Sequence, residues 1–75
     1  MTRYGSKTMN LATRAQMLRF QADLNEIDNI DIEEDGYWGN ETETAVRYVQ
    51  NKANITVDGI AGTYTKLWVY EYSHD

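Results

Sequence analysis

The sequence contains no cysteine and no proline among its 75 residues, and its single histidine is His74. Without cysteine there can be no disulfide, no thiolate metal site and no cysteine nucleophile. One histidine beside the last residue also cannot supply the several nitrogen ligands of a zinc hydrolase. The lack of proline removes the commonest helix breaker. We therefore expect a helical protein that is not an enzyme and that holds no metal and no cofactor.

Long apolar runs are missing as well. No stretch approaches the roughly 18 apolar residues that a membrane-spanning helix needs, so no membrane span is predicted. The N-terminal stretch MTRYGSKTMNLATR carries basic residues but no continuous apolar run after them. It therefore lacks the pattern of a secretory signal.

Bases are missing from one long segment, which makes the charge distribution uneven. The formal net charge is −5, yet residues 26–43 carry eight acids and no base, and the rest of the chain carries seven bases and four acids. The acids of this acidic segment are Glu26, Asp28, Asp31, Glu33, Glu34, Asp35, Glu41 and Glu43. The acidic total and the lack of a basic stripe argue against nucleic acid as a partner. Two interpretations stay open: a solvated acidic loop, or a docking face for a basic protein partner.

Glycine is scarce, and four of the five glycines lie in two similar loops, DGYWGNET (35–42) and DGIAGTYT (58–65), offset by 23 residues. In each loop the aspartate can accept hydrogen bonds from backbone N–H groups two or three residues later. The first glycine permits a positive φ, and the second is expected to do the same or to let the backbone pass close to a neighbour. The threonine is expected to bond back to the loop. The structural loop residues are thus Asp35, Gly36, Gly39, Thr42, Asp58, Gly59, Gly62 and Thr65.

The repeated loop predicts two corners that each launch a helix. By the 23-residue offset, Trp38 and Ala61 occupy equivalent places, and one large and one small residue could fit against each other. Trp38 is interpreted as a core anchor, with a ligand platform as the alternative.

Helical spacing of apolar residues predicts a first helix over residues 12–25, capped by Asn10 or Thr13. Its expected buried stripe consists of Leu11, Ala15, Leu18 and Ala22, widened by Met17, Phe20 and Leu24. The following stretch NEIDNIDIEED is dense in Asp and Asn and is expected to be a structured loop. Its isoleucines are expected to tuck under it as core plugs; they are Ile27, Ile30 and Ile32.

The second and third helices open after the second glycine of each loop. Asn40 is the expected N-cap of the second helix, with Glu43 completing a capping box, and Asn54 is its expected left-handed C-cap. Its expected buried stripe is Ala45, Val46, Val49 and Ala53. Thr63 or Thr65 is expected to cap the third helix. Four of its residues are expected to lie on one side of the helix: Tyr64, Leu67, Trp68 and Tyr72.

The fold class predicted is all-α: a compact three-helix bundle with two Asp-Gly-x-x-Gly loops. A chain of 75 residues is long enough for one domain. We expect an irregular N-terminal segment over residues 1–10 and the domain itself over residues 11–75.

The first loop also matches the start of a calcium-binding loop. Asp31, Glu33 and Asp35 fall at positions 1, 3 and 5 of such a loop, and Gly36 falls at position 6. Position 12, however, needs a bidentate glutamate and is Thr42 here. The second loop offers a single carboxylate, so no metal site is predicted.

Three motifs follow one another between Leu18 and Tyr70: FQADL (20–24), DGYWGNETETAVRYVQ (35–50) and DGIAGTYT (58–65). Their order and spacing resemble the peptidoglycan-binding domains found beside bacterial and phage cell-wall hydrolases. Members of that family read roughly L-Q-x-x-L, then D-G-x-F-G-x-x-T-x-x-A-V-x-x-F-Q, then D-G-x-x-G-x-x-T. The chain departs from this pattern at Trp38, where the family has phenylalanine, and at Val49, where it has an aromatic residue.

The resemblance implies a compact three-helix domain and non-catalytic binding of cell-wall glycan or stem peptide. The expected partner is peptidoglycan or a cell-wall hydrolase. The side chains expected to face the ligand are Tyr37, Asn40, Tyr48, Asn51 and Tyr64. Gln21 and Gln50 are expected to be polar groups facing an interhelical groove or satisfied amides near the core.

A second interpretation keeps the fold and changes the function. The protein would then be a protein–protein interaction module of a phage or mobile element, either a virion component or an inhibitor, that docks through the acidic segment. Because no secretory signal is visible, we expect the protein in the cytoplasm of a bacterial host or in a phage virion. The cell wall is then the expected site of action under the first interpretation.

Overall fold

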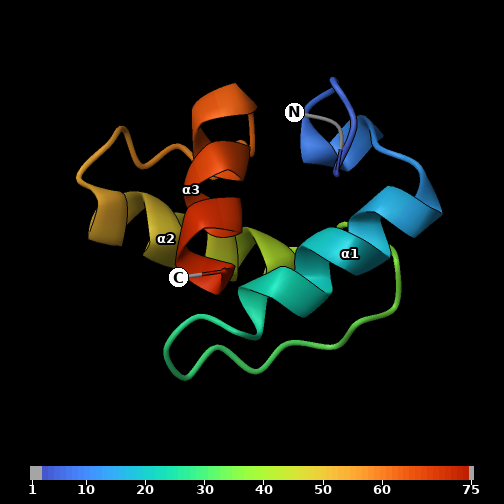
Figure 1. Cartoon of the computed structure of the whole chain (residues 1–75), viewed down its shortest axis with the longest axis horizontal. Coiled ribbons are helices and arrows are strands. Elements are labelled where there is room, and N and C mark those ends of the chain that lie inside the picture. The colour runs from blue at the N-terminus through green and yellow to red at the C-terminus, as the bar shows by residue number, and fades with distance from the viewer. Residues whose placement is uncertain (1–2, 75) are drawn as a thin grey trace.

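The computed structural model describes residues 3–74, and within them it contains helices and no strand (Figure 1). A short 3-10 helix, η1 (Met9–Leu11), precedes three α-helices: α1 (Arg14–Leu24), α2 (Asn40–Ala53) and α3 (Thr63–Ser73). Each α-helix contacts both of the others. The predicted all-α three-helix bundle is confirmed.

Helix α1 begins at a capping box. The Thr13 hydroxyl accepts a hydrogen bond from the Gln16 backbone N–H (3.2 Å), and the Gln16 side chain accepts one from the Thr13 N–H (3.0 Å). The box satisfies backbone N–H groups that have no partner within the helix. Of the two predicted caps, Asn10 and Thr13, the structure therefore selects Thr13, and the helix lies within the predicted range 12–25.

Helices α2 and α3 each begin at least one residue earlier than predicted, directly after a glycine. Their N-cap residues are Gly39 and Gly62, and neither helix has a side-chain cap. The predicted caps are wrong, because Asn40 and Thr63 are already the first helical residues and Thr65 lies inside α3. Glu43 likewise forms no capping box. Its carboxylate instead forms an ion pair with the Arg47 guanidinium, one turn later (N···O 3.1 Å).

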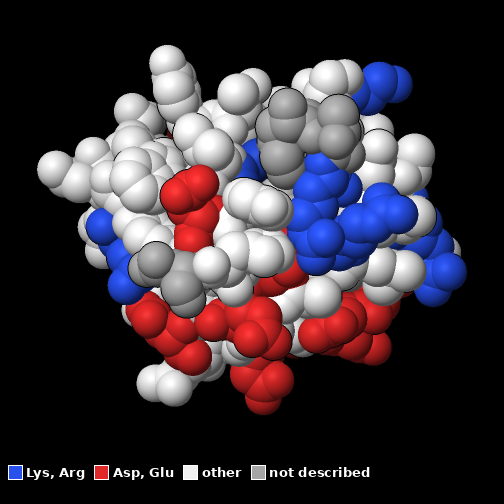
Figure 2. Space-filling view, in the orientation of Figure 1, with Lys and Arg blue, Asp and Glu red and all other residues white. Residues whose placement is uncertain are grey.

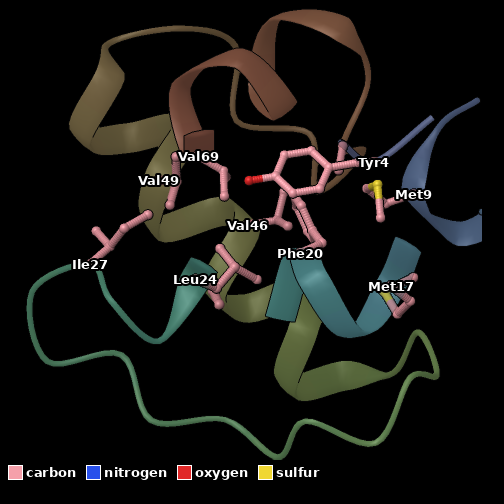
Figure 3. Packing of buried hydrophobic residues seen from close by; sticks show 11 residues of the cluster. Tyr4, Met9, Met17, Phe20, Leu24, Ile27, Val46, Val49 and Val69 are labelled. Atoms are coloured by element: carbon pink, nitrogen blue, oxygen red, sulfur yellow. The ribbon is translucent and has the colours of Figure 1, made fainter. Parts of the chain in front are cut away.

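The core collects apolar side chains from all three α-helices, the loops and the N-terminal segment (Figure 3). Its buried members are Tyr4, Met9, Met17, Phe20, Leu24, Ile27, Ala45, Val46, Val49, Ala61 and Val69. Helix α2 buries the predicted face, although Ala53 at its end is only half-buried. The prediction for the loop isoleucines is confirmed: Ile27 is buried, and Ile30 and Ile32 pack half-buried against the core. Trp38 also packs against it half-buried, which agrees with its interpretation as a core anchor.

The predicted buried face of α1 is confirmed for Met17, Phe20 and Leu24 and wrong for the other four residues. Ala15 is exposed, Leu18 and Ala22 are half-buried, and Leu11 is 65% exposed. The residues that α1 buries are Met17, Phe20, Gln21, Asp23 and Leu24. Two polar side chains thus lie on the inner face, which an apolar pattern places outside.

The four residues expected to share one side of α3 do not form its buried side. Tyr64 and Leu67 are 76% and 45% exposed, while Trp68 and Tyr72 are half-buried and stack on each other. The residues that α3 buries are Thr65, Lys66 and Val69. A threonine and a lysine therefore occupy positions at which the pattern calls for apolar residues.

The end of α2 and the loop after α1 behave as predicted. Asn54 follows α2 in the left-handed conformation (φ 59°, ψ 40°), and Asn25 organises the loop after α1. The Asn25 amide donates to the Ile32 carbonyl and accepts from the Ile32 N–H, both at 2.8 Å. This pair of bonds holds an extended stretch of the loop beside the end of α1.

Residues 3–9 supply two side chains, Tyr4 and Met9, to the core although they form no α-helix. Tyr4 is fully buried, its ring lies edge-on to Phe20 with 5.2 Å between centroids, and its hydroxyl donates to Asp23 of α1. Arg3 donates to both oxygens of the same carboxylate, at 2.6 and 3.0 Å. The segment is thereby fastened to α1.

The same segment is fastened to α3 by Lys66. This side chain is 3% exposed, and its ammonium donates to the carbonyls of Gly5 (2.9 Å) and Lys7 (2.8 Å). Burial lowers the pKa of Lys66. Within residues 3–74, no helix is both long enough and apolar enough to cross a bilayer.

Candidate binding grooves

Gln21 of α1 organises the first corner, residues 35–42. Its amide nitrogen donates to the Tyr37 carbonyl (2.9 Å), to Thr42 Oγ1 (3.1 Å) and to Asp35 Oδ1 (3.3 Å). Its amide oxygen accepts from the Gly36 N–H (2.8 Å). The glutamine thus joins the loop to the first turn of α2.

Gln50 of α2 organises the second corner, residues 58–65, with the corresponding bonds and one more, which its oxygen accepts from the Asp58 N–H (3.1 Å). Its nitrogen donates to Asp58 Oδ1 (2.8 Å), to the Ile60 carbonyl (3.0 Å) and to Thr65 Oγ1 (3.1 Å). Its oxygen accepts from the Gly59 N–H (3.0 Å). Both threonines therefore bond to a glutamine of the preceding helix, and not back to the loop as predicted.

The two aspartates carry out the predicted turn role. Asp35 Oδ1 accepts from the Tyr37 N–H and Asp58 Oδ1 accepts from the Ile60 N–H, both at 2.9 Å. These backbone bonds, and then the glutamine amides, hold the pKa of both carboxyls below the usual range. The expectation that Gln21 and Gln50 are satisfied amides is confirmed.

In each corner, the first glycine position requires glycine and the second does not. Gly36 and Gly59 have φ of +82° and +75°, and a Cβ there would lie 2.5 Å from Arg14 Cγ and 2.9 Å from an Arg47 guanidinium nitrogen. Gly39 is extended, and a Cβ at Gly39 or Gly62 would meet nothing within 4 Å. The prediction for the second glycine, a positive φ or a close approach, is wrong.

A groove opens beside the first corner, between the loop after α1 and the first turns of α2. This larger groove has a volume of about 600 Å³. Its lining residues are Asn29, Ile30, Asp31, Ile32, Asn40, Glu41, Thr44, Ala45 and Tyr48. Isoleucine and alanine side chains line its apolar part, and asparagine, carboxylate and phenol groups supply the polar part.

Hydrogen bonds hold the rim of the larger groove in place. The Tyr48 hydroxyl donates to Asp28, and Lys52 Nζ lies 3.3 Å from the same carboxylate. These two contacts lower the pKa of Asp28, and the hydrogen bond to Asp28 raises the pKa of Tyr48. Glu41 Oε1 accepts from the Glu33 N–H (3.0 Å), which ties α2 to the loop.

A smaller groove of about 240 Å³ opens at the second corner. Its lining residues are Gln50, Ile55, Thr56, Asp58, Ile60, Gly62, Thr63, Tyr64 and Thr65. Three of its positions correspond to positions of the larger groove at the 23-residue offset: Ile55 to Ile32, Thr63 to Asn40 and Tyr64 to Glu41. A further hollow of about 300 Å³ is lined by both Trp38 and Ala61, so these equivalent residues lie close together.

The structure does not bring the five predicted ligand residues together. Asn40 and Tyr48 line the larger groove, and Tyr64 lines the smaller one. Tyr37 is 65% exposed and lies against Arg14, whose guanidinium carbon is 5.4 Å from the ring centroid. The fifth residue, Asn51, is exposed on α2 and lines neither groove.

Acidic side chains gather along one edge of the molecule, over the loop between α1 and α2, and basic side chains gather over the N-terminal segment and α1 (Figure 2). The acids nevertheless form no metal site in the part of the chain that the structure describes, where no three His, Asp or Glu side chains are grouped to hold an ion. Asp35, the fifth position of the calcium-like loop, is engaged by the Tyr37 N–H and by Gln21.

A family model of peptidoglycan binding domains matches residues 13–67, which is most of the chain. The chain belongs to this family. The matched region of the peptidoglycan-binding domain contains both corners and both grooves, whereas the N-terminal segment that supplies Tyr4 and Met9 lies before it. No match to the chain was found among curated proteins or among solved structures.

Several lining residues of the peptidoglycan-binding domain were not predicted from the sequence. Ile30 and Ile32 were expected only as core plugs, yet both also line the larger groove together with Asp31, Glu41 and Thr44. The repeat carried a usable signal, because Ile32 and Ile55 stand at the same place relative to the two corners.

Proposed function

We propose that the domain is a non-catalytic module that binds bacterial peptidoglycan and holds the stem peptide in the larger groove. Membership of the family supports the ligand class. The observation that carries the proposal is the groove itself, whose volume of about 600 Å³ lies within the range of roughly 300–1,000 Å³ found for ligand sites.

The shape of the larger groove suits a short extended peptide. Asn40, Thr44 and Tyr48 line it at intervals of four residues, so they follow one face of α2. Eight helical residues rise about 12 Å, which corresponds to about three to four residues of extended chain. The side-chain amides of Asn29 and Asn40 offer donors and acceptors for peptide groups, and the isoleucines offer contact for aliphatic side chains.

The charge of the larger groove disfavours the anionic polymers of a cell wall as ligands. Asp31 and Glu41 both line it, and no basic residue does. A polyanion would be repelled there, so recognition depends on hydrogen bonds and apolar contact. Binding of this kind is weakened little by salt, because salt screens exposed charges most strongly.

Retention on purified insoluble peptidoglycan tests the proposal. We expect the parent protein to be retained in moderate salt. Thr44→Trp places a large side chain at an exposed position of the groove wall, and we expect it to reduce the retained fraction by about tenfold. The matched control is Ala15→Trp, at an exposed position of α1 outside both grooves, which is expected to bind like the parent.

Circular dichroism of both variants establishes that each is folded before binding is compared. Failure of the parent to be retained, or equal retention of Thr44→Trp and the parent, would contradict the proposal.

The acidic segment supports a second candidate function, docking to a basic protein. Glu26, Asp31, Glu33 and Glu34 are all exposed along it, and acidic side chains cover that edge of the molecule (Figure 2). Binding through this face depends on electrostatic attraction and would be lost as salt is raised. No retention on peptidoglycan, combined with salt-sensitive binding of one specific protein, would favour this function.

A further inference from the structure

The smaller groove is built by the same means as the larger one but has different chemistry. Both corners use a glutamine, an aspartate carboxylate, a backbone carbonyl and a threonine hydroxyl, with matching bonds. The amide-to-threonine distance is 3.1 Å in both. These shared residues hold each corner together, and the residues that differ between the corners give the two grooves different chemistry.

The acids around the first corner are among the residues that differ. At the 23-residue offset, Asp31, Glu33, Glu34 and Glu41 correspond to Asn54, Thr56, Val57 and Tyr64. Each carboxylate is thus replaced by an uncharged side chain at the second corner. The aspartate that remains there, Asp58, is engaged by the Ile60 N–H and the Gln50 amide.

What the smaller groove offers a ligand is an aromatic ring, an aliphatic side chain and hydroxyls. Tyr64 is 76% exposed and Ile60 is 57% exposed at the groove, and Thr56 and Thr63 add hydroxyl groups. An exposed aromatic face pairs with the C–H face of a sugar ring, and hydroxyls pair with sugar hydroxyl and amide groups. An uncharged sugar can bind in this groove without breaking an ion pair.

The size of the smaller groove suits a single sugar ring. Its volume of about 240 Å³ lies below the roughly 300–1,000 Å³ of sites for drug-sized ligands. We propose that the smaller groove is a sugar subsite that takes one N-acetylhexosamine ring of the glycan strand on Tyr64. This inference rests on the proposed function, in which the larger groove holds the stem peptide.

Titration of the isotope-labelled protein with two soluble probes, followed by backbone amide chemical shifts, tests the inference. The first probe is an oligomer of N-acetylglucosamine without peptide, and the second is a stem peptide without sugar. We expect the oligosaccharide to shift amides of residues 55–65 and the peptide to shift amides of residues 29–48. Oligosaccharide shifts centred on the larger groove, or peptide shifts centred on the smaller one, would overturn the inference.

Variants of Tyr64 supply the second measurement. Loss of a stacked ring in Tyr64→Ala is expected to weaken oligosaccharide binding by about 2- to 10-fold, while Tyr64→Phe keeps the ring and is expected to bind like the parent. The control is Leu67→Ala, one turn later on α3, which is 45% exposed and lines neither groove. Equal binding by Tyr64→Ala and the parent would overturn the inference.

The two proposals fail in different ways. If the parent is retained on peptidoglycan through the larger groove but the oligosaccharide shifts no amide at the second corner, only the sugar subsite is lost. If the parent is not retained and neither probe shifts any amide, the peptidoglycan-binding function itself is wrong.

Discussion

Gln21 and Gln50 are 0% and 1% exposed, and each uses both ends of its amide to hold a corner. An unpaired buried polar group costs about 1–3 kcal/mol, so a glutamine is tolerated in this core only because its partners are complete. Across residues 3–74, no buried side-chain nitrogen or oxygen is without a hydrogen-bond partner. Single side chains with complete bonding thus set the angles at which α2 and α3 leave their loops.

At the same residue scale, one substitution should have opposite effects at the two glycines of the second corner. Gly59→Ser forces a side chain into a left-handed conformation at φ +75° and should lower the free energy of unfolding by about 1–2 kcal/mol. Gly62→Ser enters open space at an N-cap that has no side-chain hydrogen bond, and should raise it by about 0.5 kcal/mol. Chemical denaturation followed by circular dichroism measures both changes. Destabilisation by Gly62→Ser equal to that by Gly59→Ser would show that the second glycine is required.

The residue scale also shows where the sequence was informative. The pattern D-G-x-x-G-x-x-T predicts the aspartate turn and the first glycine, because those roles depend on neighbours in the chain. It does not predict the partner of Thr42 or Thr65, because each bonds to a glutamine of the preceding helix, 21 and 15 residues away. The second glycine was misjudged because its place in the motif does not reveal its φ.

At the scale of elements, the N-terminal segment acts as a fourth packing unit beside the three α-helices. It places Tyr4 and Met9 in the core and is held by Asp23 on one side and Lys66 on the other. Both of these charged residues are buried, at 5% and 3% exposure. Since a buried charge is costly without partners, the segment and the two helices stabilise one another.

Substitutions in the N-terminal segment should therefore affect the whole fold. We expect Tyr4→Ala to lower the free energy of unfolding by about 3–5 kcal/mol, because it removes a fully buried aromatic ring. Tyr4→Phe removes only the hydroxyl that donates to Asp23 and should cost about 1.5–3 kcal/mol. Leu11→Ala, at a 65% exposed position, should change it by less than about 0.5 kcal/mol. An average point mutation lowers the free energy of unfolding by about 1 kcal/mol. A smaller change in Tyr4→Ala would mean that the segment is not part of the core.

The elements themselves were predictable in number and order, but not in orientation. Helical periodicity and the paired loops are local features, so α1, α2 and α3 follow from the sequence. The rotation of α1 and α3 does not follow fully, because Asp23 and Lys66 are charged residues that are buried only through partners far along the chain. The larger groove was missed for the same reason, since it joins a loop to a helix face.

At the scale of the whole molecule, charge is separated, with acids over the loop between α1 and α2 and bases over α1 and the N-terminal segment (Figure 2). The two corner aspartates differ from the exposed acids, because hydrogen-bond donors lower the pKa of Asp35 and Asp58. A carboxyl with a folded pKa below its unfolded value of about 3.9 stabilises the fold above that value. The contribution is lost as pH falls through the folded pKa.

Acid should therefore remove the advantage of Asp58 over asparagine. Asp58→Asn keeps an oxygen that can accept from the Ile60 N–H, so the turn persists and only the charge is lost. We expect the parent to be more stable than Asp58→Asn above about pH 4, and the difference to shrink as pH is lowered toward about pH 2. Parallel urea denaturations across this range measure it. A difference that is constant with pH would show that the carboxylate charge has no part in the turn.

Helix α2 serves both corners, since Thr42 in its first turn closes one and Gln50 near its other end organises the other. The two corners consequently cannot unfold independently of each other. Thermal unfolding should be a single cooperative transition. The losses of stability from substitutions at opposite corners should not be additive, because each substitution weakens the helix that both corners share.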